Sequence, residues 1–207
     1  MLDVLEKLFR NGMYGMMNAV PGTGITAAIT TAFSATAAYY ALFNSALSGE
    51  YALIPSFIKL DVATVPASAT SMEAIIAIDV GNRVASGGTA FSLLTARSIG
   101  PIAQTMTVDA RVGAVVAGAE TASVVRCEQL VIKPSVPVIR DQYLIDFGLF
   151  GRLAHTVGTS RIVVPAEPVI VLPQQSFLFH LWVPGNTVTA GAYEFQAHFM
   201  RVPLAEI

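Results

Sequence analysis

The residues that most often carry chemistry are few in this chain and lie far apart. The three histidines are His155, His180 and His198, and no two of them have the HxH or HxxxH spacing that turns a pair of imidazoles toward one metal ion. Asp141 and Asp146 flank a short apolar run, but acid–base catalysis needs two carboxylates that converge on a cleft, and nothing in the spacing favours this. The sequence therefore predicts no enzyme, no catalytic residue, no metal site and no cofactor.

Two further features are interpreted as structural rather than functional. The run Pro21-Gly22-Thr23-Gly24 lacks the following lysine and hydroxyl residue of a phosphate-binding loop, and no strand precedes it, so we interpret it as a hinge or turn. The single cysteine, Cys127, cannot form an internal disulfide or a cysteine-rich metal site. We expect it to be a small buried or half-buried strand residue. Packing and association must then provide the stability of the fold.

Charged side chains are scarce throughout the chain. They make up 13% of the residues, and hydrophobic residues make up 54%, whereas soluble domains usually carry about 25% charged residues. Three explanations compete: a membrane protein, an aggregation-prone fragment, or a subunit whose surface is covered by neighbours. Because obligate interfaces resemble a domain core cut in half, we favour the covered subunit. The net charge of −2 and the absence of a basic cluster argue against nucleic acid and anionic membranes as direct partners.

One long segment, between Arg10 and Glu50, carries no charge at all. Its most apolar part, residues 24–43, has about the length of a membrane span but is diluted by threonine and serine and consists largely of alanine. We interpret it as buried protein and predict no membrane contact, with a membrane-active segment as the less favoured alternative. Asp3 and Glu6 occupy the place of the cationic region of a signal peptide, so we do not expect one.

Apolar residues near the N-terminus recur at spacings of three and four, which predicts one face of a helix over residues 1–20. Pro21-Gly22 would end this helix. The apolar face must be buried either against the chain's own domain or against a neighbouring chain, and the sequence leaves both possibilities open. We take residues 1–23 as an N-terminal arm, helical or extended, whose predicted interface residues are Leu2, Leu5, Leu8, Phe9, Met13, Met16 and Met17.

From residue 24 onward the pattern is typical of β-structure, predicting one all-β domain, residues 24–207. Short runs rich in valine, isoleucine, threonine and aromatic residues alternate with glycine, proline, asparagine and serine. Regular turn signals without interleaved helical patterns favour an antiparallel β-sandwich or barrel. The expected strands are 39–44, 57–65, 73–80, 105–109, 112–117, 123–132, 142–146, 161–163, 169–172, 176–183 and 192–201. The residues expected to form the core are Phe177, Phe179, Leu181, Tyr193, Phe195 and Phe199.

Two apolar runs resemble segments of a known class of proteins. The first is Tyr40-Ala41-Leu42-Phe43-Asn44-Ser45-Ala46-Leu47 through Ile54-Pro55, and the second extends from Leu172-Pro173 through Phe177-Leu178-Phe179-His180-Leu181-Trp182 to Ala192-Tyr193-Glu194-Phe195. They resemble small virion structural proteins of tailed bacteriophages, of the jelly-roll cement or decoration type. The likeness covers about a third of the chain and consists of packing patterns. It implies a jelly-roll-like β-sandwich, a symmetric homo-oligomer (often a trimer) and a shell of major capsid protein as partner.

Together these features predict a virion structural protein on the capsid surface, a cement or decoration subunit that stabilises the shell through apolar inter-subunit contacts. The missing basic arm favours a position outside the shell, away from the genome. The alternatives are a jelly-roll subunit that forms the shell itself, a spike or host-recognition module, and a β-sandwich enzyme. A recognition module would expose tryptophan and tyrosine, but Trp182, the only tryptophan, lies in an apolar run.

Overall fold

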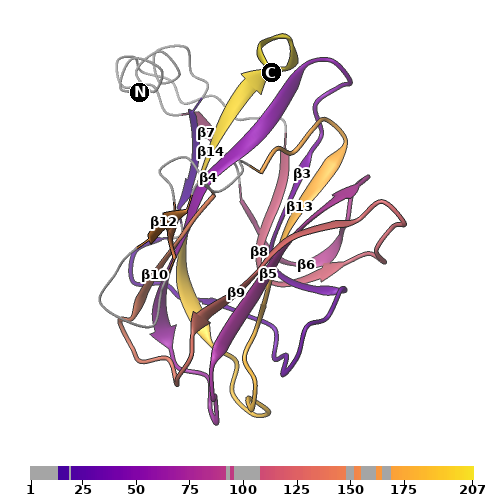
Figure 1. Ribbon diagram of the computed structural model, residues 1–207. Helices are drawn as coiled ribbons and strands as arrows, with labels where there is room; N and C mark the ends of the chain where they lie inside the picture. The colour runs from indigo at the N-terminus through magenta and orange to yellow at the C-terminus, as the bar shows by residue number, and fades with distance from the viewer. Residues whose placement is uncertain are drawn as a thin grey trace.

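A computed structural model describes residues 14–18, 20–91, 94–95, 108–147, 152–154, 162–164 and 169–207 of the chain. Within these residues the fold is all-β, with two antiparallel sheets packed against each other (Figure 1). No helix in this part of the chain has the length and apolar character needed to cross a membrane. The elements are β1 (Tyr14–Asn18), β2 (Ile25–Thr26), β3 (Ala37–Asn44), β4 (Tyr51–Thr64), β5 (Met72–Val80), β6 (Val84–Phe91), β7 (Leu94–Thr95), β8 (Val108–Ala117), β9 (Val125–Lys133), β10 (Gln142–Asp146), β11 (Arg152–Ala154), β12 (Ile162–Val164), β13 (Gln175–Trp182), β14 (Ala192–Pro203) and the 3-10 turn η1 (Leu204–Glu206).

The strand order is that of a jelly roll. Sheet A has the order β10-β4-β14-β1-β7, with β2 also paired to β14, and sheet B has the order β6-β8-β3-β13-β5-β9. If β1, β3, β4, β5, β9, β10, β13 and β14 are counted as strands 1 to 8, sheet A contains the order 6-3-8-1 and sheet B the order 2-7-4-5. This is the double Greek key of a jelly roll. The predicted antiparallel β-sandwich is confirmed, and β6 and β8 widen sheet B beyond the jelly-roll frame.

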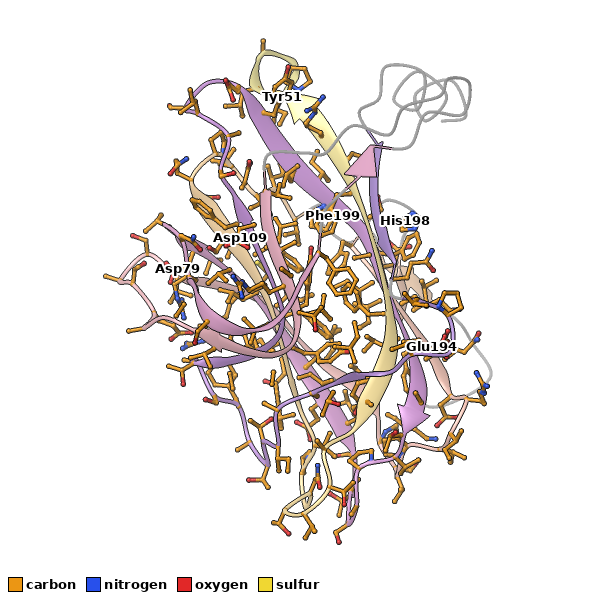
Figure 2. All side chains as sticks on the ribbon, turned by 180° about the vertical axis from the view of Figure 1, so that it is seen from behind. Tyr51, Asp79, Asp109, Glu194, His198 and Phe199 are labelled. Atoms are coloured by element: carbon orange, nitrogen blue, oxygen red, sulfur yellow. The ribbon has the colours of Figure 1, made fainter. Side chains whose placement is uncertain are left out.

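The core lies between the sheets because alternate side chains of each strand point inward. In β14, Phe195 and Phe199 are buried, whereas Glu194 and His198 are only half-buried, as the period of two in a strand requires. Figure 2 shows Phe199 pointing into the sandwich and Glu194 and His198 on its outside. Each buried aromatic side chain of this kind stabilises the fold by roughly 1.5–3 kcal/mol. All six predicted core residues are buried: Phe177, Phe179, Leu181, Tyr193, Phe195 and Phe199.

The central strands of sheet B differ from β14 because they are buried on both faces. Every residue of β3 after Ala37 and of β13 after Gln175 is buried. Three segments lie over the outer face of this sheet: residues 30–36, 81–83 and 118–124, which we call the covering layer. Phe33 of this layer contacts His180 and Trp182, with ring centroids 5.3 and 6.1 Å apart. A second apolar cluster, with Val124 of the layer packed against it, consists of Ala38, Ala41, Ala77, Val115, Ala117 and Leu178.

The helix predicted for residues 1–20 is wrong over Tyr14–Asn18. These residues form β1, which pairs with β14 on one side and with β7 on the other, so that Met16 lies opposite both His198 and Leu94. A strand between two neighbours forms hydrogen bonds along both edges, and Gly15 disfavours the helix, so tertiary pairing outweighs the local helical pattern. Residues 1–13 and 19 lie outside the described residues, and the division into an arm and a domain stays a prediction.

Two other differences from the expected strands have local causes. β4 begins at Tyr51, six residues before the expected start at residue 57. A proline normally interrupts a strand because it has no N–H to donate, but Pro55 lies where the register between β4 and β14 shifts, and the strand continues through it. β6 was not expected, because Gly87 and Gly88 interrupt its pattern. Both glycines have positive φ, and a Cβ on Gly87 would lie 2.4 Å from the Ala114 carbonyl oxygen. The expected strand 169–172 contains only a single bridge, between Val171 and Leu53.

Candidate functional site

The histidines are placed in packing positions in the described part of the chain. His180 of β13 is 1% exposed, and its Nδ1 donates a hydrogen bond to the Ala37 carbonyl oxygen at 2.8 Å. Burial lowers the pKa of His180, an effect that the nearby Arg83 reinforces and Glu120 opposes. His198 of β14 stacks on Phe57 with ring centroids 4.2 Å apart, and burial also lowers its pKa. His155 lies outside the described residues.

No cluster suited to a metal ion is found where side chains are described: no three His, Cys, Asp or Glu residues there come close enough to share one. Cys127 is exposed on β9, an edge strand of sheet B. The expectation of a buried or half-buried position for this residue is therefore wrong. Among the described strands, β9 has a neighbour on one flank only, which its sequence pattern does not reveal.

The carboxylate of Asp141 organises a loop. It accepts hydrogen bonds from the Lys133 ammonium group, the Tyr143 hydroxyl and, at 2.8 Å, the Val138 backbone N–H. These donors, Lys133 first, lower the pKa of Asp141 to about 2. The neighbouring Arg140 approaches Glu194 at 3.6 Å. Asp141 is thus ionised and committed to holding the β9–β10 connection, which does not suit a proton donor at neutral pH.

A buried ion pair fastens the covering layer to sheet B. The guanidinium of Arg83 donates to Asp79 and to the carbonyl oxygens of Ala35 and Gly118, and Asp79 also accepts from Thr121. The side chains of Arg83 and Asp79 are 3% and 0% exposed. Burial alone raises the pKa of Asp79, but the hydrogen bonds from Thr121, Arg83 and Val80 outweigh burial and hold this pKa below its usual value. Because each charge has its partners inside the protein, we interpret the pair as a structural clamp.

Four connections lie together at one end of the sandwich and contain no charged residue. They are residues 27–36, 65–71, 134–139 and 183–191, and we call their surface the uncharged end. The first connection continues over sheet B as part of the covering layer. In Figure 1 it is the lower end, opposite the C-terminus. Charged residues begin immediately beside it, with Lys133 and Arg140 flanking the third connection. The uncharged end joins the ends of both sheets, so its composition belongs to neither sheet alone.

Backbone hydrogen bonds join three of these connections to one another, and the third connection, residues 134–139, is held beside the end of β4. The backbone N–H of Thr70 donates to the Pro184 carbonyl oxygen at 2.9 Å, and that of Val183 donates to Thr30 at 2.9 Å. The backbone N–H of Arg140 donates to Val62, at the end of β4, also at 2.9 Å. Gly185 has a φ of +82°, and a Cβ there would lie 2.6 Å from the Ser68 carbonyl oxygen. Two connections therefore touch through backbone, which fixes their relative positions.

Large apolar side chains are exposed on three of the four connections of the uncharged end. Val138 and Ile139 are each 57% exposed, and Val188 is 72% exposed. Between them lie exposed hydroxyl side chains such as Thr70 and Thr187. Single exposed valines are common on protein surfaces, so it is their occurrence on three neighbouring connections without charge that indicates a contact site. The exposed large apolar residues of this end are Ile29, Val136, Val138, Ile139 and Val188.

The predicted interface residues fall elsewhere. Leu2, Leu5, Leu8, Phe9 and Met13 lie outside the described residues, and Met16 and Met17 belong to β1, inside sheet A. Sequence reasoning did not find the uncharged end, because its four connections are far apart in the chain. The available signal was that four turn-rich segments all lack charge, and only the topology brings them together.

Comparisons with family models, curated proteins and solved structures find no match for this chain.

Proposed function

We propose that this chain is a virion structural protein, a cement or decoration subunit on the outer surface of a capsid. The uncharged end is the observation that carries the proposal, because an exposed apolar surface on an otherwise well-packed sandwich is suited to contact with other proteins. A subunit of this kind works by burying surface against its neighbours, and it needs no cofactor. The major capsid protein and further copies of the chain are its proposed partners.

Charge supports a position outside the shell. The chain has a net charge of −2, and the cations Lys59, Arg83, Lys133 and Arg140 each have a carboxylate partner. Contact with a genome requires clusters of lysine and arginine that can replace counterions along the phosphate backbone. The jelly-roll order of the strands is also frequent among capsid domains, although a fold alone does not determine function.

The test is addition of the purified full-length chain to capsids assembled from the major capsid protein without it. We expect saturable binding, visible by electron microscopy as added density on the outer surface, together with higher resistance of the capsids to heat. Capsids without the added chain, heated in the same buffer, are the control. A chain that stays in the supernatant when capsids are pelleted would contradict the proposal.

The shell-forming jelly-roll subunit is the second candidate, and the complete eight-strand order favours it. The same preparation distinguishes the two functions, because a shell-forming subunit assembles into closed particles without added capsid protein. The third alternative, a spike or host-recognition module, has less support. Such a module would expose tryptophan, but Trp182 is only 6% exposed and packs against Phe33.

A further inference from the structure

We propose that the uncharged end binds the same end of a second copy of this chain, forming a symmetric homo-oligomer. The inference rests on the proposed structural role and assigns this apolar surface to the contact between copies of the chain, so that contact with the shell falls to another surface. Three features of the uncharged end favour a second copy as its partner: the absence of charge, the fixed conformation of its connections, and the absence of the aromatic and basic residues that would favour a membrane.

The first argument is self-complementarity. In an interface about a symmetry axis, identical residues of two copies face each other near the axis, so any charge there meets its own sign. The four connections of the uncharged end contain no charged residue, and such an interface therefore creates no repulsion. A partner of different sequence imposes no such restriction, because a lysine on one side can face an aspartate on the other.

The polar side chains of the uncharged end are of the kind that can pair with themselves. The exposed ones are all hydroxyls, and a hydroxyl both donates and accepts a hydrogen bond. Thr70 donates through Oγ1 to the Pro184 carbonyl oxygen at 3.1 Å, and its oxygen can still accept from a second copy. The exposed hydroxyl residues of this end are Thr31, Thr36, Ser68, Thr70, Ser135, Thr187 and Thr189.

The second argument is that the surface is already ordered before binding. Asp141 holds Val138 through its backbone N–H, and two prolines, Pro134 and Pro137, restrict the same connection. The contact between Gly185 and Ser68 restricts the connection that carries Val188. Little conformational entropy is then lost when the exposed valines and isoleucines are covered, and this favours association.

The third argument concerns the chemistry that is absent from this end. Loops that insert into a membrane interface present tryptophan and tyrosine, with lysine or arginine near anionic headgroups. Within the four connections the only aromatic residue is Phe33, which packs on His180 and Trp182. A protein surface of the same neutral, apolar composition fits this end better than a lipid surface does.

The test is the molar mass of the full chain in solution, measured by sedimentation velocity over a range of concentrations. We expect the wild type to be an oligomer. Val138→Lys and Val188→Lys are each expected to weaken self-association by about tenfold or more, because each places an ammonium group in an apolar contact that holds no carboxylate to pair with it. These side chains are 57% and 72% exposed and belong to different connections, so the effect of one variant is checked by the other.

Val125→Lys is the matched control. Val125 is 59% exposed, a fraction similar to the 57% of Val138. It lies at the end of β9 that pairs with Ile78, away from the uncharged end. We expect it to associate like the wild type, and circular dichroism with thermal melting verifies that each variant is folded. The inference is overturned if the wild type is a monomer, if neither lysine at the uncharged end weakens association, or if Val125→Lys weakens it equally.

Vesicles of phosphatidylcholine provide the remaining arm of the test. Sedimentation of the chain with these vesicles, abolished by Val138→Lys, would overturn the inference in favour of a lipid surface. The outcome is independent of the capsid experiment. If the chain self-associates through this end but does not bind capsids, the cement function is disproved and the homo-oligomer is supported. If the chain is a monomer that binds capsids, the homo-oligomer is disproved and the cement function is supported.

Discussion

The outer faces of the two sheets are built in opposite ways. On sheet A, Lys59 lies 3.1 Å from Asp61, and the side chains are 32% and 21% exposed. On sheet B, the side chains of Arg83 and Asp79 are 3% and 0% exposed, and their ion pair joins the covering layer to the sheet. Figure 2 shows Asp79 and Glu194 on opposite sides of the molecule. The same types of side chain thus form a solvated surface on one face and an internal clamp on the other.

This difference shows that the value of an ion pair depends on what surrounds it. Water screens the exposed pair and its long side chains lose entropy when fixed, so such pairs contribute little. The buried pair is not screened, and removal of one partner leaves a charge without compensation. The same contrast applies to the two aromatic contacts with histidine, Phe57–His198 on sheet A and Phe33–His180 on sheet B. Matched substitutions on the two faces test this difference between buried and exposed contacts.

The largest effect is expected for Arg83→Ala. This change leaves the buried Asp79 carboxylate without its cation and frees the carbonyl oxygens of Ala35 and Gly118. We expect the free energy of unfolding to fall by about 3–5 kcal/mol, measured by urea denaturation followed through the fluorescence of Trp182. Arg140→Ala is the control, because Arg140 is 80% exposed in its pair with Glu194, and its loss should cost under about 1 kcal/mol. Equal costs for the two variants would remove the distinction between the faces.

A smaller effect is expected for Phe33→Ala. The ring contacts His180, Trp182 and the guanidinium of Arg126, whose central carbon lies 5.3 Å from the ring centroid. Because Phe33 is only half-buried, we expect a loss of about 2 kcal/mol. Trp182 fluorescence should also shift to the red as water reaches the indole. Phe57→Ala, which removes the half-buried ring from His198, should cost less, since solvent already reaches that face. A larger loss for Phe57→Ala would contradict the comparison.

The smallest effect concerns pH. Burial lowers the pKa of His180 in the folded chain, whereas an unfolded histidine titrates near pH 6.5. Between these two pKa values the unfolded chain binds more protons, so the free energy of unfolding falls as the pH falls below about 6.5. This loss is separated from that of Asp141, whose pKa of about 2 places its effect below pH 4.

Two variants assign the pH effect to one face. We expect His180→Gln to flatten the dependence of unfolding free energy on pH below about 6.5, measured by urea denaturation at several pH values. His198→Gln should keep more of the wild-type slope, because His198 is half-buried whereas His180 is buried. If His198→Gln removes the slope and His180→Gln retains it, the face responsible is sheet A.

Much of the sandwich could be predicted from the sequence, and the misses have identifiable causes. Alternation in β14 correctly placed Phe195 and Phe199 in the core, because the period of two is a local property of a strand. In β13 the same rule divides inward Phe179 from outward His180, but it does not reveal that His180 is also buried. The covering layer causes that burial, and it comes from segments up to 151 residues away, as the hydrogen bond from Thr30 to Leu181 shows.

The candidate site was less predictable than the fold. Sequence reasoning assigned the contact surface to Leu2, Leu5, Leu8, Phe9, Met13, Met16 and Met17 because their spacing forms one apolar stripe. Of these, Met16 and Met17 form part of β1 inside sheet A. The uncharged end has no such local pattern, since Val138 and Val188 belong to different connections. A surface assembled from separate loops leaves no periodic signal in any one of them.

By itself, the sequence determined the class of fold and the shortage of charge, because alternation, turn residues and composition act over a few residues at a time. Only the tertiary structure decided where the few charges lie and which uncharged segments meet. The jelly-roll order brings four distant connections to one end, and backbone hydrogen bonds such as Thr70 to Pro184 hold three of them together. The physical reason is that strand pairing joins residues across long separations in the chain, so the composition of a surface depends on topology rather than on neighbours in sequence.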